Sequence, residues 1–155
     1  MLALLTATAM ILSYVESLLP SFGIPGVKIG LANIAVIFTL FRLGWKEGIA
    51  VSLVRVLLVT LLFSSPAALA YSAAGAVLSL VVMALLRRIQ VFSTVGVSVA
   101  GGVAHNAGQI LVAMWLLETD TLIYYLPVLV VAGVAGGILT GLCAALLIRR
   151  IPDTE

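Results

Sequence analysis

Apolar residues fill almost the whole chain and are interrupted only by short polar or Gly- and Pro-containing segments. Each uninterrupted apolar segment is long enough for a helix. Pro20 would end the first helix, and Ser64 or Ser65 would cap the fourth, with Pro66 in its first position. The six predicted helices cover about 2–19, 30–43, 47–63, 66–88, 94–117 and 127–149.

The composition places these helices in a membrane. The 155 residues are 63% hydrophobic and only 9% charged, whereas about a quarter of the residues in soluble domains are charged. We therefore expect an all-α integral membrane protein with six transmembrane helices, and a single domain over residues 1–155, with the lipid bilayer around it. The second helix is short for a span, so part of the segment 20–29 is expected to dip into the membrane. Met1 opens directly into apolar sequence without a basic stretch, which predicts a mature helix and not a cleaved signal peptide.

The distribution of basic residues predicts the orientation. One set of loops and the C-terminus carry six basic residues, whereas the opposite loops carry only Lys28. Cytoplasmic loops are enriched in Lys and Arg, so both termini are expected on the cytoplasmic side of the cell membrane. The six residues are Arg42, Lys46, Arg87, Arg88, Arg149 and Arg150.

The fifth predicted helix carries polar residues on one side, near its centre. At about 100° per residue, this side includes Ser98, Gly102, His105, Asn106 and Gln109. Polar side chains in the middle of a membrane turn towards other helices or towards a ligand. Two interpretations are open: a packing seam, in which glycines 101 and 102 admit a neighbouring backbone, or a binding or transport site.

Arg55 is the most informative charged residue. It lies eight positions after Glu47, about 12 Å into the membrane, where a charge is costly unless it is paired or hydrated. It is either a structural clamp or an anchor for an anionic ligand group, because its planar guanidinium suits carboxylates and phosphates. Glu16 is interpreted as a solvated end of the first helix.

Two further sets of residues suggest a role from their positions: a polar pair near the outer surface, and small residues spaced for close helix packing. Lys28 and Asn33 flank Gly30, and together they could form a polar outer mouth above Arg55 and His105. Small residues spaced by four, as at Ala3 and Ala7 and at glycines 137 and 141, let helices approach closely. The glycines are expected to serve internal packing, whereas the alanines suit either internal packing or a partner subunit.

Several chemistries are not supported by the sequence. One histidine and one cysteine, Cys143, cannot form a zinc cluster or a set of disulfides. There is no P-loop for ATP hydrolysis, and the only aspartates, Asp120 and Asp153, do not form a pair that could hold Mg²⁺ on a diphosphate. No basic-aromatic pattern suggests nucleic acid. We expect no catalytic residues, no metal, no cofactor and no nucleic-acid partner.

Three motifs carry a family resemblance. PGVKIGLANI at 25–34, SLVRVL at 52–57 and GVAHNAGQ at 102–109 resemble, in this order, the Gx transporter family, also catalogued as heptaprenyl diphosphate synthase component I. YYLP at 124–127 extends the resemblance to nearly the whole chain. The family looks like the substrate-binding S components of energy-coupling factor (ECF) transporters.

This resemblance implies a function. S components are six-helix proteins with both termini inside, and they bind a solute in a pocket open to the outside and capped by the loop between helices 1 and 2. A small-residue motif on helix 1 docks them onto a T subunit that carries two ATPases, and Ala3 and Ala7 fit that motif loosely. The expected ligand is a small anionic or polar solute. We expect its pocket to be lined by Arg55, His105, Asn106 and Gln109, with Lys28 and Asn33 in its lid or mouth.

Two alternatives stay open. The family's second name implies an accessory component of heptaprenyl diphosphate synthase, which makes isoprenoid side chains of quinones. Relatives also look associated with small flavin-binding electron-transfer proteins, so the chain could be the membrane subunit of a redox assembly.

Overall fold

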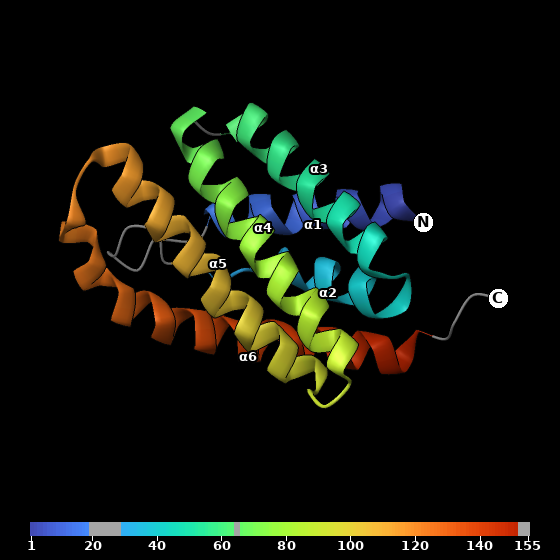
Figure 1. The fold of residues 1–155 in the computed structure, drawn as a ribbon. Helices are drawn as coiled ribbons and strands as arrows, with labels where there is room; N and C mark the ends of the chain where they lie inside the picture. The colour runs from blue at the N-terminus through green and yellow to red at the C-terminus, as the bar shows by residue number, and fades with distance from the viewer. Residues whose placement is uncertain (19–28, 64–65, 152–155) are drawn as a thin grey trace.

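The protein is an all-helical bundle in the computed structural model, which describes residues 1–18, 29–63 and 66–151 (Figure 1). This confirms the predicted all-α class with six α-helices among the described residues. A short 3₁₀ helix, η1 (Asp120–Tyr125), precedes the last one. The α-helices are α1 (Leu2–Leu18), α2 (Asn33–Arg42), α3 (Trp45–Phe63), α4 (Pro66–Ile89), α5 (Thr94–Leu117) and α6 (Leu126–Arg150).

Local chemistry sets the helix ends. Ser93 caps α5, because its side-chain oxygen accepts a hydrogen bond from the backbone N–H of Gly96 at 3.1 Å. Pro127 lies in the first turn of α6, where it removes no helical hydrogen bond. The helix α2 is shorter than predicted, because Gly30 has φ +81° and starts a turn that delays the helix to Asn33. The predicted caps Ser64 and Ser65 lie outside the described residues.

The helices have the character of membrane spans. Three stretches are long and apolar enough to cross a bilayer: Leu69–Ile89, Thr94–Leu117 and Asp120–Arg150. The apolar helices α1 and α2 are shorter, and α3 includes three charged residues. Large apolar side chains point outward, such as Leu61 at 69% and Val131 at 70% exposed. A surface of this kind suits lipid, and it indicates a multi-pass membrane protein.

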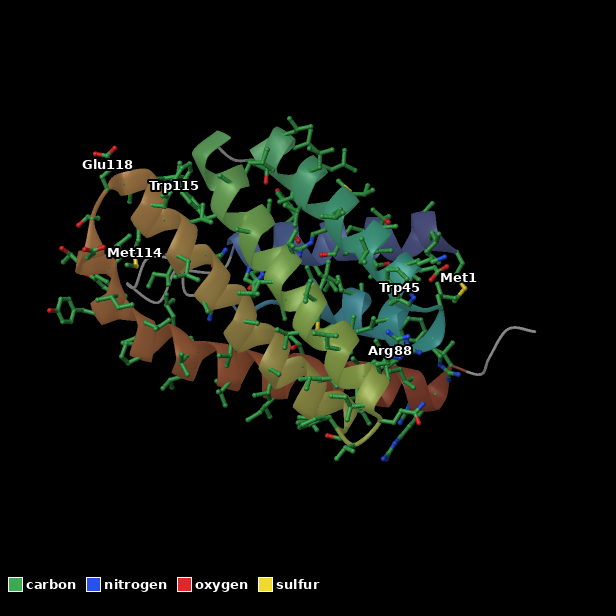
Figure 2. The ribbon with its side chains drawn as sticks, in the orientation of Figure 1. Met1, Trp45, Arg88, Met114, Trp115 and Glu118 are labelled. Carbon is green, nitrogen blue, oxygen red and sulfur yellow. The ribbon has the colours of Figure 1, made fainter. Side chains whose placement is uncertain are left out.

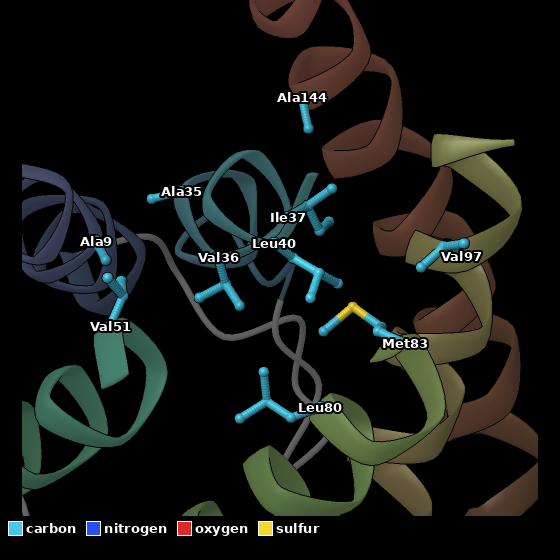
Figure 3. Packing of buried hydrophobic residues seen from close by; sticks show 10 residues of the cluster. All are labelled: Ala9, Ala35, Val36, Ile37, Leu40, Val51, Leu80, Met83, Val97 and Ala144. Atoms are coloured by element: carbon cyan, nitrogen blue, oxygen red, sulfur yellow. The ribbon is translucent and has the colours of Figure 1, made fainter. Parts of the chain in front are cut away.

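The short helix α2 forms the centre of the bundle. It contacts α1, α3, α5 and α6, and all six residues from 35 to 40 are buried. Its Ile37 and Leu40 pack in one cluster with Met83 of α4, Val97 of α5 and Ala144 of α6 (Figure 3). Around this core, α5 lies along both α4 and α6, while α1 packs on α3.

The contact between α5 and α6 is made by glycines. A Cβ atom on Gly102 would lie 2.6 Å from the carbonyl oxygen of Gly133, and one on Gly137 would lie 2.6 Å from Cα of Val99. Any side chain there would push the helices apart. The predicted internal use of the α6 glycines is confirmed, and so is the close backbone approach at Gly102. Gly101 differs, because it packs against the side chain of Met83 on α4.

Basic residues gather at one end of the bundle, here called the basic end. Figure 2 shows Met1, Trp45 and Arg88 at this end, and Met114, Trp115 and Glu118 at the opposite end. The helix termini place the other basic residues beside Trp45 and Arg88, at the end of α2, the end of α4 and the end of α6. The basic end therefore carries Arg42, Lys46, Arg87, Arg88, Arg149 and Arg150.

Two of these arginines also tie helices together. Arg42 donates hydrogen bonds to the carbonyl oxygens of Ile148 and Ile151 at the end of α6. Arg87 donates to the carbonyls of Leu40 and Phe41 near the end of α2. The last carbonyls of a helix have no partner within the helix, so these two side chains satisfy them across the bundle.

Candidate functional site

A polar cavity of about 80 Å³ lies inside the bundle. Every α-helix contributes to its wall: α1 and α2 each supply a polar residue, α3 an arginine, α4 a serine, α5 three polar side chains, and α6 glycines and an alanine. The polar residues that line it are Glu16, Asn33, Arg55, Ser72, His105, Asn106 and Gln109.

The structure brings together most of the residues singled out from the sequence. Five of them line this one cavity: Asn33, Arg55, His105, Asn106 and Gln109. They come from α2, α3 and α5, so sequence-distant motifs meet at one place. Lys28 lies outside the described residues.

Arg55 has few partners for a guanidinium inside a helix bundle. Its Nη1 donates to the hydroxyl of Ser13 on α1 at 3.5 Å, a long hydrogen bond. Its Nε is buried and has no hydrogen-bond partner within the described part of the chain. Glu16 lies near enough to interact with it electrostatically. Because a buried donor without an acceptor is costly, the Nε position is suited to an acceptor atom of a bound molecule.

Glu16 belongs to the cavity and is not a solvated helix end, contrary to the sequence interpretation. Its carboxylate accepts a hydrogen bond from the backbone N–H of Gly30 at 2.5 Å, and it lines the cavity beside Arg55. This contact joins the end of α1 to the turn before α2. An acidic residue in an otherwise apolar segment is the feature that could have identified it.

The polar side of α5 serves both packing and the cavity. The Asn106 side-chain amide donates to the carbonyl of Leu129 on α6 at 2.6 Å, and the Ser98 hydroxyl bonds to that of Thr140 at 3.1 Å. Ser98 does not line the cavity, whereas Gln109 does. The packing interpretation is therefore confirmed for Ser98 and Asn106, while Asn106 and Gln109 also line the cavity.

Gly75 of α4 brings α4 close to the cavity residues of α5. A Cβ atom at Gly75 would lie 2.7 Å from Cγ of Gln109 and 2.7 Å from the carbonyl oxygen of His105. The missing side chain thus allows α4 to pack on this part of α5. A lone glycine in an apolar segment gave no reason to single it out.

The small residues of α1 point away from the bundle. Ala3 and Ala7 are exposed, whereas Ala9 is fully buried against the core. The pair therefore lies on the outer surface of α1 and is not used for packing inside the described part of the bundle.

Among the described residues that line the cavity, Glu16 supplies a carboxylate and Arg55 a guanidinium. Within the described ranges, no group of three or more His, Cys, Asp or Glu side chains is arranged to hold a metal ion. The cavity can thus offer a small molecule both hydrogen-bond donors and acceptors, and both a positive and a negative charge.

Comparison with known families identifies the kind of protein. The sequence model of the family described as heptaprenyl diphosphate synthase component I matches residues 5–147, a range that includes all of the cavity residues. The chain belongs to this family. The resemblance carried by the three sequence motifs is confirmed to that extent. No curated protein and no solved structure matches the chain.

Proposed function

We propose that this member of the component I family is a substrate-binding membrane subunit for uptake of a small solute, and that the cavity is its binding site. The observation that carries the proposal is the buried Nε of Arg55, which has no acceptor among the described residues although Arg55 lines a cavity. A purely structural arginine, such as Arg87, has its donors on backbone carbonyls.

The lining selects a polar solute with an acceptor group. A carboxylate or similar group would bind Arg55, while Gln109 offers further hydrogen bonds. Glu16 offsets the charge of Arg55, so a solute with both anionic and donor groups fits better than a simple anion. The volume of about 80 Å³ is roughly half of a 150 Å³ cavity that admits benzene. A solute as large as benzene or larger would therefore require the helices to move apart.

The proposed orientation places both termini in the cytoplasm. The six basic residues then lie on the cytoplasmic side, as the positive-inside rule requires. Glu16 is close to the end of α1 far from Met1, and Gln109 is in the half of α5 nearer Leu117. The cavity is therefore in the outer half of the bundle, which suits a solute that enters from outside the cell membrane.

Transport needs an energy source that this chain does not carry, because its sequence has no ATP-binding P-loop. The proposed partners are an ECF-type T subunit and its ATPases. The exposed Ala3 and Ala7 surface of α1 is the proposed contact with that subunit.

The family description favours a second candidate function, an accessory role beside a prenyl diphosphate synthase. The chain would then act without catalysing the reaction, since its aspartates cannot form a Mg²⁺–diphosphate site. The redox-assembly alternative predicts a flavoprotein partner in place of a synthase.

Mass spectrometry of the tagged, purified protein distinguishes these functions. A transport subunit should co-purify with a T subunit and ATPases, and should retain a small solute that is lost in Arg55→Ala. Recovery of a prenyl synthase whose chain elongation rises equally with wild-type and Arg55→Ala protein would favour the accessory role. Recovery of a flavoprotein, with no solute retained, would favour the redox assembly.

A further inference from the structure

A second site lies on the outside of the bundle, between α3 and α4 at the basic end. It consists of two adjoining hollows that share Trp45, Ala84 and Leu85. One hollow is almost entirely apolar and has a volume of about 390 Å³. The other has a volume of about 480 Å³ and is lined by Arg87, Arg88 and Gln90 in addition to the shared residues. A polar, basic hollow thus continues into an apolar groove.

The apolar groove has the regular geometry of two packed helices. Trp45, Ile49 and Leu53 are four residues apart and form one face of α3. From Trp45 to Leu53 this face extends about 12 Å along the helix. On the α4 side, Leu80 is buried at 4% exposure and forms the floor, while Leu85 at 57% is open to the outside. The groove is therefore accessible from the surrounding lipid along its length.

The basic hollow has one fixed and one available guanidinium. Arg87 is held by the carbonyls of Leu40 and Phe41, and lies 5.3 Å above the centre of the Phe41 ring. Arg88 is exposed at the end of α4. Across the groove, the ammonium of Lys46 lies 5.7 Å from the centre of the Trp45 ring. No Asp or Glu lines either hollow among the described residues.

We propose that this pair of hollows binds one anionic phospholipid of the surrounding bilayer. Its phosphate lies at Arg88, and one acyl chain lies in the groove between Trp45 and Leu53. Charge complementarity and lateral access argue for this occupant: the charged residues that line the head region, Arg87 and Arg88, are both basic, and the groove opens onto the outward-facing apolar surface. Tryptophan at such a position suits the boundary between head groups and hydrocarbon.

The anion is attracted by side chains and not by the helix. The hollow lies at the C-terminal end of α4, where exposed carbonyls disfavour negative charge. Removing the charge of Arg88 should therefore remove most of the preference for an anionic head group. The site shares no residue with the polar cavity, so it can exist whether or not the cavity binds a solute.

The test uses the full-length protein in neutral detergent, titrated with phosphatidylglycerol or with phosphatidylcholine of the same acyl chains. Native mass spectrometry measures retained lipid, and thermal unfolding measures stabilisation. We expect one tightly retained phosphatidylglycerol per chain and a smaller effect of phosphatidylcholine. Arg88→Gln should weaken phosphatidylglycerol binding about fivefold, since each basic residue near a membrane surface contributes about 1 kcal/mol of attraction to anionic lipid.

Matched variants separate the site from the general surface. Arg150→Gln removes an equally exposed charge at the same end of the bundle, on α6, and should leave binding unchanged. Ala84→Leu narrows the place where the two hollows meet and should weaken binding, whereas Ala135→Leu on the exposed side of α6 should not.

Three results would overturn the proposal. Equal retention of phosphatidylcholine would show that the basic hollow does not select the head group. An equal loss in Arg150→Gln would show that the attraction is diffuse and not local to Arg88. Displacement of phosphatidylglycerol by an equimolar amount of farnesyl diphosphate would assign the site to a prenyl diphosphate in place of a bilayer lipid.

Discussion

Arg55 and Arg87 are both arginines in apolar helices, but their surroundings give them different roles. Arg87 places its guanidinium on two backbone carbonyls at the end of α2. Arg55 has one long hydrogen bond, to Ser13, and a buried Nε without a partner among the described residues. The first arrangement completes the structure of a neighbouring helix, and the second leaves a buried donor unpaired, which in the proposed function binds the solute. The two residues should therefore respond differently to substitution.

We expect Arg55→Ala to fold normally and to bind solute about 10- to 100-fold more weakly, because a hydrogen bond to a charged group contributes roughly 1.5–3 kcal/mol. Arg55→Lys should recover little, since an ammonium cannot reproduce the bidentate guanidinium. Thermal unfolding of the purified protein and mass spectrometry of the retained solute measure the two effects. Arg87→Ala is the control, and should lower the unfolding temperature. An Arg55→Ala protein that unfolds as early as Arg87→Ala would show a structural clamp.

Asn106 and Gln109 offer a second comparison on one helix. The Asn106 amide bonds to the carbonyl of Leu129, so Asn106→Leu should destabilise the protein by about 0.6 kcal/mol, the usual value between membrane helices. Gln109 lines the cavity and has no such bond in the described structure. Gln109→Leu should keep the unfolding temperature and reduce the amount of solute that the purified protein retains, measured by mass spectrometry. Unchanged retention in Gln109→Leu would remove this residue from the site.

Between elements, the glycines of α6 control how closely α5 can lie. Gly141 is a sharp test because it does not line the cavity: a Cβ atom there would be 2.8 Å from Cβ of Ser98 and 2.9 Å from Cα of Val95. We expect Gly141→Ala to destabilise the bundle by about 1–3 kcal/mol, the cost of overpacking. Chemical or thermal unfolding in detergent measures this change.

Gly96→Ala is the matched control on α5, since its nearest neighbour would be 3.6 Å away, an ordinary contact. Alanine is favoured over glycine in a helix by about 1 kcal/mol, so this variant should be as stable as the wild type or slightly more stable. Equal destabilisation by both alanines would contradict the close contact between α5 and α6.

Helix ends could be predicted from the sequence wherever a local cap determines them. Ser93 and Pro127 marked the starts of α5 and α6 to within one residue. The start of α2 could not be predicted to the residue, because glycine permits either a helix or a turn, and the positive φ of Gly30 sets a turn there.

Contacts between distant residues could not be predicted in this way. Arg42 bonds to Ile148, 106 positions away, and no local pattern identifies such a pair. Glu16 was misinterpreted for the same reason: its partner Gly30 lies beyond the end of α1. Cavity residues such as Arg55 and His105 were identified because a polar group in an apolar helix is costly wherever it lies.

For the molecule as a whole, the basic end combines two properties. Arg42 and Arg87 complete the ends of α6 and α2, while the remaining basic residues stay available at the surface. The same residues that fasten the helices thus also contribute to the positive charge that orients membrane proteins. In the proposed orientation, this end would therefore serve both the packing of the helices and the topology of the chain.

The proposed orientation leads to a direct test with reporter fusions. Fusions at Lys46, Arg88 and the C-terminus should be active as cytoplasmic reporters, and fusions at Ser65 and Asp120 as external ones, because six basic residues lie on one side and one on the other. Replacing Arg149 and Arg150 with Gln is a control that lowers the positive charge of the basic end. It should leave the reporter pattern unchanged, since four basic residues remain at that end. A cytoplasmic result at Ser65 would reverse or break the six-span arrangement. If the arrangement is reversed, the half of the bundle that holds the polar cavity would face the cytoplasm, and the solute would then have to be bound from that side.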